Sequence, residues 1–337
     1  MKAVIVDKPG ALRVGDAPDM KIDDYQALVR TLACSICNGT DRKILDGTIP
    51  FFGREAYPGI LGHESVGRVV KVGKKVTCFH EGDLVFRPMA DVEGLNCFWG
   101  GFAELGAVTD LKALEQDGAK PCNRASHPGQ QVIPGEVDLL EATVCITLKE
   151  VMSFLRTLQV KTGDSLLVLG YGPVGLSFAY LAKAIGMGPV IVAGRREDAL
   201  RTARKFGADE TVNVNAETID EKVKAVVKEG VDVIIDAIGK AYLVEDAAKS
   251  LAPDGKIGTY AVVNRGDESL DRAKVKNIAS AGPDESKAHD EIIKLWHDGR
   301  IQPDRFISHV LPMSEVKTGF DLIEQKQALK VVLNIGG

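Results

Sequence analysis

The sequence predicts an α/β protein of two domains, one β-rich and of barrel type, the other built on a doubly wound parallel sheet. Three observations predict this fold class. The chain has 337 residues, more than one compact domain usually holds. Its first part is rich in glycine and proline, and turn signals recur about every ten residues. From about residue 147, short apolar runs alternate with helical patterns, as in parallel sheets covered by helices.

We expect the first domain to comprise residues 1–147 together with 296–337, and the second to comprise residues 148–295. Strand-like runs in the first domain are Ala27–Thr31, Gly67–Val72 and Asp83–Phe86. Expected strands in the second are Ser165–Leu169, Pro189–Ala193, Glu210–Val214, Asp232–Ala237, Lys256–Ala261 and Lys274–Ala279; expected helices include Val151–Leu158, Val174–Ile185 and Asp198–Phe206. The last stretch breaks the alternation with helices His289–His297 and Glu315–Ile323 and strand Lys330–Ile335, and we expect it to complete the first domain's sheet.

The composition is that of a soluble globular protein, because 45% of the residues are hydrophobic and 26% are charged. A net charge of −5 argues against a nucleic-acid partner, which usually selects a basic face. No run approaches the roughly 20 apolar residues of a membrane helix, and the N-terminus is interpreted as a first strand rather than a signal peptide. The six cysteines are scattered through the first half, which favours a reducing, cytoplasmic compartment over a disulfide framework.

A glycine fingerprint follows the strand pattern that ends at residue 169. It reads Gly170-Tyr171-Gly172-Pro173-Val174-Gly175, and a helical pattern comes next. This is G-x-G-x-x-G between a strand and a helix, the context in which it binds a dinucleotide. The first glycine permits the tight turn, the second lets the backbone approach a pyrophosphate, and the third lets the helix pack closely. We therefore expect dinucleotide binding, although a glycine-rich turn alone is the simpler interpretation.

The end of the next strand indicates which dinucleotide is bound. An acidic residue there would hydrogen-bond the ribose diol of NAD, but the sequence has Gly194 followed by Arg195 and Arg196. Guanidinium groups suit bidentate contact with a phosphate, so this pattern favours the 2′-phosphate of NADP. The alternative is that both arginines belong to a solvated helix start, and Glu197 weakens the positive field.

Earlier in the chain than the fingerprint, four residues are of types that a catalytic zinc takes as ligands. They are Cys37, the consecutive pair His63 and Glu64, and Cys145. Taken singly, a histidine here is more often structural and a cysteine more often part of the core. Cys34 and Cys37 form a C-x-x-C pair, but no second pair completes a four-cysteine site, and the region lacks a thioredoxin-like unit. The metal hypothesis therefore depends on the whole set.

Together these motifs resemble those of the zinc-dependent medium-chain dehydrogenase/reductase superfamily, in its alcohol, polyol and threonine dehydrogenase branch. The resemblance covers nearly the whole chain. It rests on the Cys37 motif, Tyr57–Gly67, Glu81–Val85, Gly100–Glu104, Gly170–Gly175 and Lys205–Asp209. It implies an N-terminal GroES-like barrel domain that binds zinc and a Rossmann domain that binds NAD(P).

The resemblance also implies roles for single residues. Cys37 and His63 match the family's zinc ligands, and Glu64 matches a carboxylate that binds zinc directly or lies beside it. The family's last ligand precedes the helix before the fingerprint; Cys145 is the preferred match and Glu150 the alternative. Lys330 resembles a basic residue that relatives place near the cofactor, and an ordinary surface lysine is the other interpretation.

Three departures from the family pattern concern the metal site. Asn38 is an extra residue after Cys37, so the loop beside the metal is altered. Thr40 still matches the hydroxyl that relays the substrate proton, while Lys43 stands where many relatives have a relay histidine. The four-cysteine structural lobe is missing, since only Cys97 occurs in the corresponding segment, and we predict one zinc per chain.

The resulting hypothesis is a zinc-dependent oxidoreductase that transfers a hydride between a secondary alcohol or polyol, or the matching ketone, and NADP(H). One alternative is a zinc-free quinone or enoyl reductase of the same superfamily, and another is a non-catalytic NADP-binding protein. We expect a small-molecule substrate, no nucleic-acid or membrane partner, and a homo-oligomer, either dimer or tetramer. Four aromatic residues supply either a substrate pocket or β-domain core, namely Phe51, Phe52, Phe98 and Trp99, while Asn38, Lys43 and Arg54 would favour a polyol or an acidic group.

Overall fold

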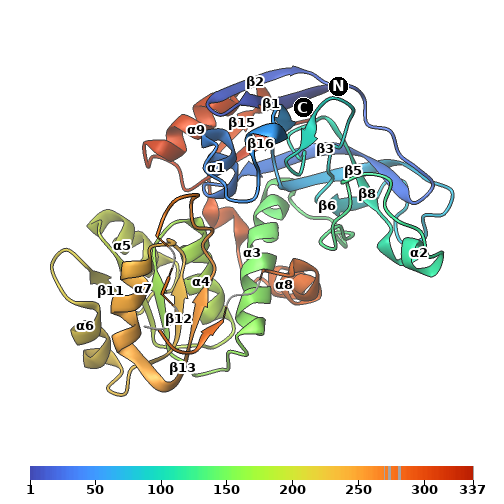
Figure 1. The fold of residues 1–337 in the computed structure, drawn as a ribbon. Coiled ribbons are helices and arrows are strands. Elements are labelled where there is room, and N and C mark those ends of the chain that lie inside the picture. The colour runs from blue at the N-terminus through green and yellow to red at the C-terminus, as the bar shows by residue number, and fades with distance from the viewer. Residues whose placement is uncertain (269, 272–274, 280–281, 337) are drawn as a thin grey trace. The chain divides into compact units, whose positions relative to one another are not determined.

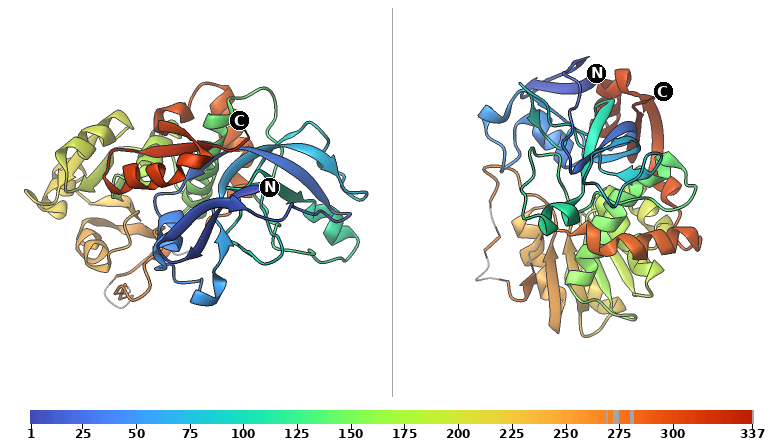
Figure 2. Two further views of the ribbon diagram at one scale, coloured as in Figure 1. Left: turned by 90° about the horizontal axis from the view of Figure 1, so that it is seen from above. Right: turned by 90° about the vertical axis from the view of Figure 1, so that its right-hand side faces the viewer.

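The computed structural model describes residues 1–268, 270–271, 275–279 and 282–336 and divides into two compact units (Figure 1). The first comprises Met1–Thr147 and Glu285–Gly337, and the second comprises Leu148–Asp284. Both termini lie in the first unit (Figure 2). The predicted α/β class is confirmed. Within the described residues, no helix is both long and apolar enough to cross a membrane.

The first unit is built mainly of strands. They are β1 (Lys2–Lys8), β2 (Ala11–Asp16), β3 (Gln26–Ile36), β4 (Gly59–Ile60), β5 (Glu64–Val72), β6 (Leu84–Phe86), β7 (Asn96–Cys97), β8 (Leu105–Thr109), β15 (Ile307–Pro312) and β16 (Lys330–Asn334). Its helices are α1 (Thr40–Asp46), α2 (Leu111–Gln116), α8 (His289–His297), α9 (Val316–Glu324) and the start of α3 (Leu139–Thr157). One sheet has the order β2-β1-β4-β7, and the other has β15-β16-β3-β5-β6 with β8 also paired to β3.

The last strand completes the second of these sheets, as the sequence predicts. β16 runs antiparallel to β3, with Val331 opposite Ile36 and Leu333 opposite Cys34. All four of these residues are buried, and they belong to the main apolar core of this unit. The pairing therefore ties the two ends of the chain together through hydrophobic burial.

The second unit holds a six-stranded parallel sheet in the order β11-β10-β9-β12-β13-β14. The strands are β9 (Leu166–Leu169), β10 (Val190–Gly194), β11 (Glu210–Asn213), β12 (Val231–Asp236), β13 (Leu251–Thr259) and β14 (Ile278–Ala279). The helices that alternate with them are α4 (Pro173–Ala184), α5 (Glu197–Lys205), α6 (Ile219–Val226) and α7 (Ala241–Ala247). All four residues of β9 are buried, as expected for a central parallel strand covered on both faces.

The strand order reverses beside β9, since the chain runs from β9 through β10 to β11 on one side and returns to β12 on the other. Ligands of doubly wound sheets bind beyond the carboxyl ends of the strands at such a switch point. The glycine fingerprint begins at this end of β9.

Two differences from the expected elements stand out. Helix α3 begins at Leu139, well before the predicted Val151, and its residues 142–149 are buried. The expected strand at 274–279 is observed as β14, and residue 274 lies outside the described residues.

The chain returns to the first unit at Glu285 rather than at the predicted 296. The carboxylate of Glu285 is buried and pairs with the guanidinium of Arg87. Further along, the indole N–H of Trp296 donates to Glu141 at 2.8 Å. These contacts hold helix α8 within the first unit.

Candidate metal and dinucleotide sites

Strand pairing brings three predicted residues to one end of a sheet. Cys37 directly follows β3, Glu64 opens β5 and Lys330 opens β16, and β3 lies between the other two strands. Ser35 pairs with both Glu64 and Val332. Because side chains alternate along a strand, Cys37, Glu64 and Lys330 share one face of the sheet.

Three ligand-type residues form one cluster here. The Cys37 thiol, a ring nitrogen of His63 and a carboxylate oxygen of Glu64 lie within 4.8 Å of one another. His63 and Glu64 are buried and Cys37 is half-buried. Gly62 precedes His63 with a φ of 99°, and a Cβ there would lie 2.6 Å from the Phe102 backbone nitrogen. Only glycine therefore lets the chain turn His63 into the cluster.

A buried carboxylate orients two members of the cluster. Asp41 Oδ1 lies 3.1 Å from His63 Nδ1, and Asp41 Oδ2 accepts a hydrogen bond from the Cys37 backbone N–H at 2.9 Å. A carboxylate behind Nδ1 keeps the proton on that nitrogen and leaves Nε2 available as a ligand. Burial opposes protonation of the metal-free ring, but the charges of Asp41 and Cys37 outweigh it and raise the His63 pKa well above its ordinary value.

Glu64 is held by a buried ammonium group. Lys330 Nζ lies 2.7 Å from Glu64 Oε1 and 2.5 Å from Oε2, and both side chains are almost fully buried. The Thr147 hydroxyl donates to Glu64 Oε1 at 2.8 Å and accepts from Lys330 Nζ at 3.1 Å. Burial raises the pKa of Glu64, but Lys330 and His63 outweigh it and hold the pKa below its usual value. Lys330 is thus not a surface lysine.

The structure does not add Cys145 or Glu150 to the cluster. Thr147 is the residue of α3 that contacts Glu64, and Cys145 precedes it by two positions, about 200° around the helix. Cys145 is fully buried, and Glu150 accepts a hydrogen bond from the Tyr260 hydroxyl at 3.2 Å. Cys34 lies in the apolar core of the first unit rather than in the cluster.

The loop after Cys37 carries the other predicted residues of this site. The Thr40 N–H donates to Cys37 Sγ at 3.4 Å, which places the start of α1 beside the thiol. Lys43 lies one turn further along the same helix. The amide of the extra residue Asn38 donates to the Leu329 carbonyl at 3.0 Å, so the insertion links this loop to the segment before β16.

In the second unit, the three glycines of the fingerprint differ in what a side chain at each position would meet. Gly170 has a φ of 108°, which other residues rarely adopt. A Cβ on Gly175 would lie 2.2 Å from the Gly170 carbonyl oxygen. A Cβ on Gly172, in contrast, would meet nothing within 4 Å in this chain. The protein itself does not require glycine at 172, so the space there is left for a ligand. Pro173 and Val174 follow as the first residues of α4.

Gly194 is buried at the end of β10, and the ring of Tyr171 covers it. A Cβ on Gly194 would lie 2.0 Å from Tyr171 Cε1, so the ring occupies the place where an acidic side chain would begin. The guanidinium of Arg196 lies 6.0 Å from the centre of the same ring. A side chain at position 194 would therefore have to displace the Tyr171 ring.

The charged residues next to Gly194 differ in their partners. Arg196 pairs with Asp198 at 3.1 Å, and Glu197 Oε1 accepts a hydrogen bond from the Asn213 amide. The exposed Arg195 has no ion pair or side-chain hydrogen bond within the described part of the chain. Glu197 is therefore engaged elsewhere, and Arg195 is available to an anion.

Three residues that shape these two sites were not predicted to do so. Asp41 follows Gly39 and Thr40 in the sequence. The sequence does not show that the fold brings its carboxylate next to His63, which is 22 positions away. Thr147 and Tyr171 carry no motif signal of their own, since each acts on a residue that the fold brings next to it.

Comparison with known proteins agrees with this architecture. Residues 23–117 match the family model described as alcohol dehydrogenase GroES-like domain, and residues 173–289 match the one described as zinc-binding dehydrogenase. The chain is 28% identical over 350 residues to an L-threonine 3-dehydrogenase of Bacillus licheniformis, with 99% of this chain and 98% of the relative covered. It is 25% identical over 353 residues to a sorbitol dehydrogenase of Bombyx mori, with the same coverage.

A third relative is the NADP-dependent isopropanol dehydrogenase of Thermoanaerobacter brockii, 28% identical over 334 residues, with 89% of this chain and 88% of the relative covered. Among solved structures, the alcohol dehydrogenase TADH from Thermus sp. ATN1 superposes with a TM-score of 0.82 at 25% identity and covers 99% of both chains. The expected class of oxidoreductase, acting on CH–OH donors with a nicotinamide cofactor, is confirmed at this level. The chain belongs to the zinc-type medium-chain dehydrogenase/reductase superfamily.

Proposed function

We propose that this protein oxidises a secondary alcohol or polyol, or reduces the matching ketone, with one catalytic zinc per chain and NADP(H) as the preferred cofactor. The observation that carries the proposal is the buried cluster of Cys37, His63 and Glu64, with Asp41 behind the histidine. In the reaction a secondary alcohol and NADP⁺ become a ketone, NADPH and a proton. When bound, zinc supplies a Lewis acid toward the alcohol oxygen and the nicotinamide supplies the hydride acceptor.

The donor set fits zinc. A thiolate, an imidazole nitrogen and a carboxylate are among its usual ligands, and catalytic sites keep a further position open. Cys37 and His63 are the ligands that we assign, because their ligand atoms face the cluster and Asp41 orients both residues. Glu64 remains beside them, held by Lys330. Cys145 is not assigned as a further ligand, because it lies outside this cluster.

Thr40 is the residue that we assign to proton transfer. It lies beside the Cys37 thiol, and its hydroxyl makes no hydrogen bond within the described residues. A hydroxyl at this place can take the proton of the alcohol and pass it on. Lys43 follows on the same face of α1, so it provides a second group toward solvent.

The preference for NADP is supported by the end of β10. Gly194 stands where an acid would repel a 2′-phosphate, the Tyr171 ring covers it, and Arg195 is available to bind the phosphate. Gly170, Gly172 and Gly175, with Pro173 and Val174 at the start of α4, provide the phosphate turn. A charge-assisted hydrogen bond is worth roughly 1.5–3 kcal/mol, so NADP should bind at least about tenfold more tightly than NAD.

The test is metal analysis of the purified protein, followed by kinetics on alcohols and polyols with both cofactors. We expect one zinc per chain, turnover of at least one alcohol, and a higher kcat/KM with NADP⁺. Absence of zinc together with quinone reduction would favour the zinc-free alternative instead. A higher kcat/KM with NAD⁺ would mean that the arginines form a solvated helix start.

A reversal experiment sharpens the cofactor assignment. The double variant Gly194→Asp with Arg195→Ala introduces the acid and removes the available cation. Because the new Cβ would collide with Tyr171, the exchange also needs Tyr171→Ala. We expect the triple variant to prefer NAD, and Tyr171→Ala alone, the matched control, to retain the preference for NADP. Titration calorimetry with each dinucleotide measures the change independently of turnover.

A further inference from the structure

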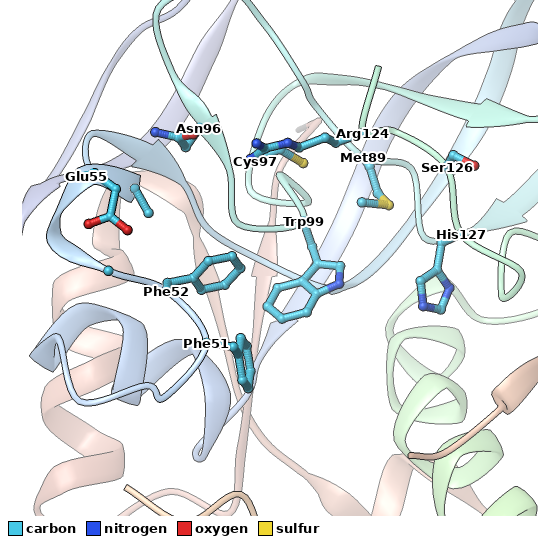
Figure 3. A pocket seen from close by; sticks show the side chains of 12 residues that line it. Phe51, Phe52, Glu55, Met89, Asn96, Cys97, Trp99, Arg124, Ser126 and His127 are labelled. Carbon is cyan, nitrogen blue, oxygen red and sulfur yellow. The ribbon is translucent and has the colours of Figure 1, made fainter. Parts of the chain in front are cut away.

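The first unit contains a cavity of about 710 Å³ that has no role so far (Figure 3). Its size falls within the range of small-molecule sites. Twelve residues line it, all of them from the first unit, and the cluster residues Cys37, His63 and Glu64 are not among them. The cavity is therefore formed by side chains other than those of the metal cluster.

One side of the cavity is an aromatic wall, formed by Phe51, Phe52 and Trp99. The ring centres of Phe51 and Phe52 are 5.2 Å apart, and those of Phe52 and Trp99 are 5.8 Å apart, all in edge-to-face contacts. Figure 3 shows the three side chains next to one another. Phe51 is 54% exposed although it packs against two other rings. An exposed phenylalanine is ordinary by itself, but here it continues a wall that leads inward.

The wall connects the cavity to the metal cluster. The Trp99 ring centre lies 5.2 Å from that of His63. Trp99 has a φ of 63°, in the left-handed region, where a large side chain is unfavourable. Phe52 packs on the buried Phe98 with a centre distance of 4.9 Å, which anchors the middle of the wall. The aromatic surface thus runs from the cluster outward to Phe51.

The remaining lining is mixed, because the polar side chains of Asn96, Ser126 and His127 reach the cavity away from the aromatic wall. Burial raises the pKa of the Cys97 thiol to about 12, so the thiol stays neutral and packs like an apolar group. Met89 is buried and also lines the cavity. Arg124 and Glu55 carry opposite charges, and Figure 3 shows the guanidinium of Arg124 away from Phe51. The charged groups therefore present no field of a single sign to a phosphate or a carboxylate.

We propose that this cavity receives the group attached to the carbinol carbon, and that the substrate is a secondary alcohol or ketone with an aromatic or bulky apolar substituent. This inference rests on the proposed function. Hydroxyl groups of a polyol placed against the three rings would lose water without finding partners, whereas an aromatic ring would gain edge-to-face contacts. In the oxidation, the carbinol carbon gives a hydride to NADP⁺ and the hydroxyl gives up its proton, as in the reaction above.

Kinetics with three probes test the substrate class. We expect kcat/KM for 1-phenylethanol to exceed that for sorbitol at least about tenfold, with 2-propanol in between. Phe51→Ala should lower kcat/KM for 1-phenylethanol about three- to tenfold and for 2-propanol less than twofold. The matched control is Leu111→Ala on α2, an apolar residue that is 36% exposed and outside the cavity. It should change none of these values.

A binding experiment separates this inference from the proposed function. The chain has two tryptophans, so Trp296→Phe leaves Trp99 as the only indole. We expect acetophenone to quench its fluorescence saturably, and Phe51→Ala to weaken that binding about three- to tenfold. Faster turnover of sorbitol than of 1-phenylethanol would overturn the substrate class and leave the dehydrogenase assignment intact. Saturable quenching without turnover of any alcohol would support the cavity and contradict the proposed function.

The alternative to a substrate at the aromatic wall is a second copy of this chain. If Phe51→Ala changed the sedimentation coefficient and left both acetophenone binding and kcat/KM unaltered, the aromatic wall would be a subunit contact and the inference would be wrong. We expect the variant to sediment as the unsubstituted protein does.

Discussion

The metal cluster of the first unit and the glycine turn of the second are built in opposite ways. The cluster and the lysine that holds it come from separate segments, since Cys37 follows β3, Glu64 opens β5 and Lys330 opens β16. The turn lies within the six consecutive residues Gly170–Gly175 and presents mainly backbone. A substitution in the cluster therefore removes a ligand or a charge, whereas a substitution in the turn adds atoms where space is needed.

Because of this difference, substitutions in the two sites should have different effects. Charges in the cluster are buried and depend on one another, so the loss of one member leaves another uncompensated. The glycines depend on local geometry, so their effects are expected to differ from one position to the next. The predictions below test this contrast, from the largest expected effect to the smallest.

Cys37→Ser should cause the largest loss. A serine hydroxyl is a poor substitute for a thiolate ligand, so zinc content should fall close to zero and kcat should fall at least about 10³-fold. Elemental analysis and initial rates measure both. Cys122→Ser is the control, because Cys122 is exposed and outside the cluster. Full zinc occupancy in Cys37→Ser would contradict the ligand assignment.

Lys330→Met should destabilise the first unit by about 3–5 kcal/mol, because it leaves the Glu64 carboxylate buried without its cation. Adding Glu64→Gln should recover part of that loss, which denaturant unfolding of both variants measures. The Glu64 pKa is lowered in the folded chain, so its contribution is complete above its ordinary value of 4.5 and disappears as the pH falls through the folded value. This acid-dependent part should be missing in Lys330→Met. A loss below about 1 kcal/mol would indicate an exposed pair.

Contiguous motifs were the part of the site that sequence reasoning could find. The turn at Gly170–Gly175 and the pair His63-Glu64 each lie within a few residues, so their spacing alone indicates their chemistry. The ion pair of Glu64 with Lys330 joins residues 266 positions apart. It depends on which strands are neighbours and in what register, and no local pattern contains that information.

The fold, like the site, was predictable where a local pattern indicates it and not where it depends on contacts between distant residues. Apolar periodicity indicates the alternating strands and helices of the second unit. The end of the second domain was expected at residue 295, whereas the second unit ends at Asp284. In the structure Glu285 is buried by its pairing with Arg87, a partner 198 positions earlier. Tyr171 was overlooked in a similar way, since the sequence shows the missing acid at Gly194 but not the ring that covers it.

Thr40→Val should lower kcat about 10²-fold, with zinc content unchanged, because it removes the hydroxyl at nearly constant volume. Lys43→Ala, one turn further along α1, should have a smaller effect. A rate that rises with pH in Thr40→Val more steeply than in the unsubstituted protein would indicate that solvent replaces the relay. Unchanged kcat in a variant with full zinc content would show that the proton leaves by another route.

The smallest expected effect is that of Gly172→Ala, which tests whether the glycine turn serves the cofactor or the fold. Because a Cβ on Gly172 meets nothing in the chain, Gly172→Ala should keep its melting temperature while its affinity for NADP falls about tenfold, the loss of roughly one charge-assisted hydrogen bond. Gly175→Ala is the matched contrast. Its Cβ would lie 2.2 Å from the Gly170 carbonyl oxygen, so the turn must shift and the melting temperature should fall as well. Calorimetric titration and thermal unfolding of both variants separate the two effects. If Gly172→Ala melted early yet bound NADP normally, the open space at 172 would serve the fold rather than the cofactor.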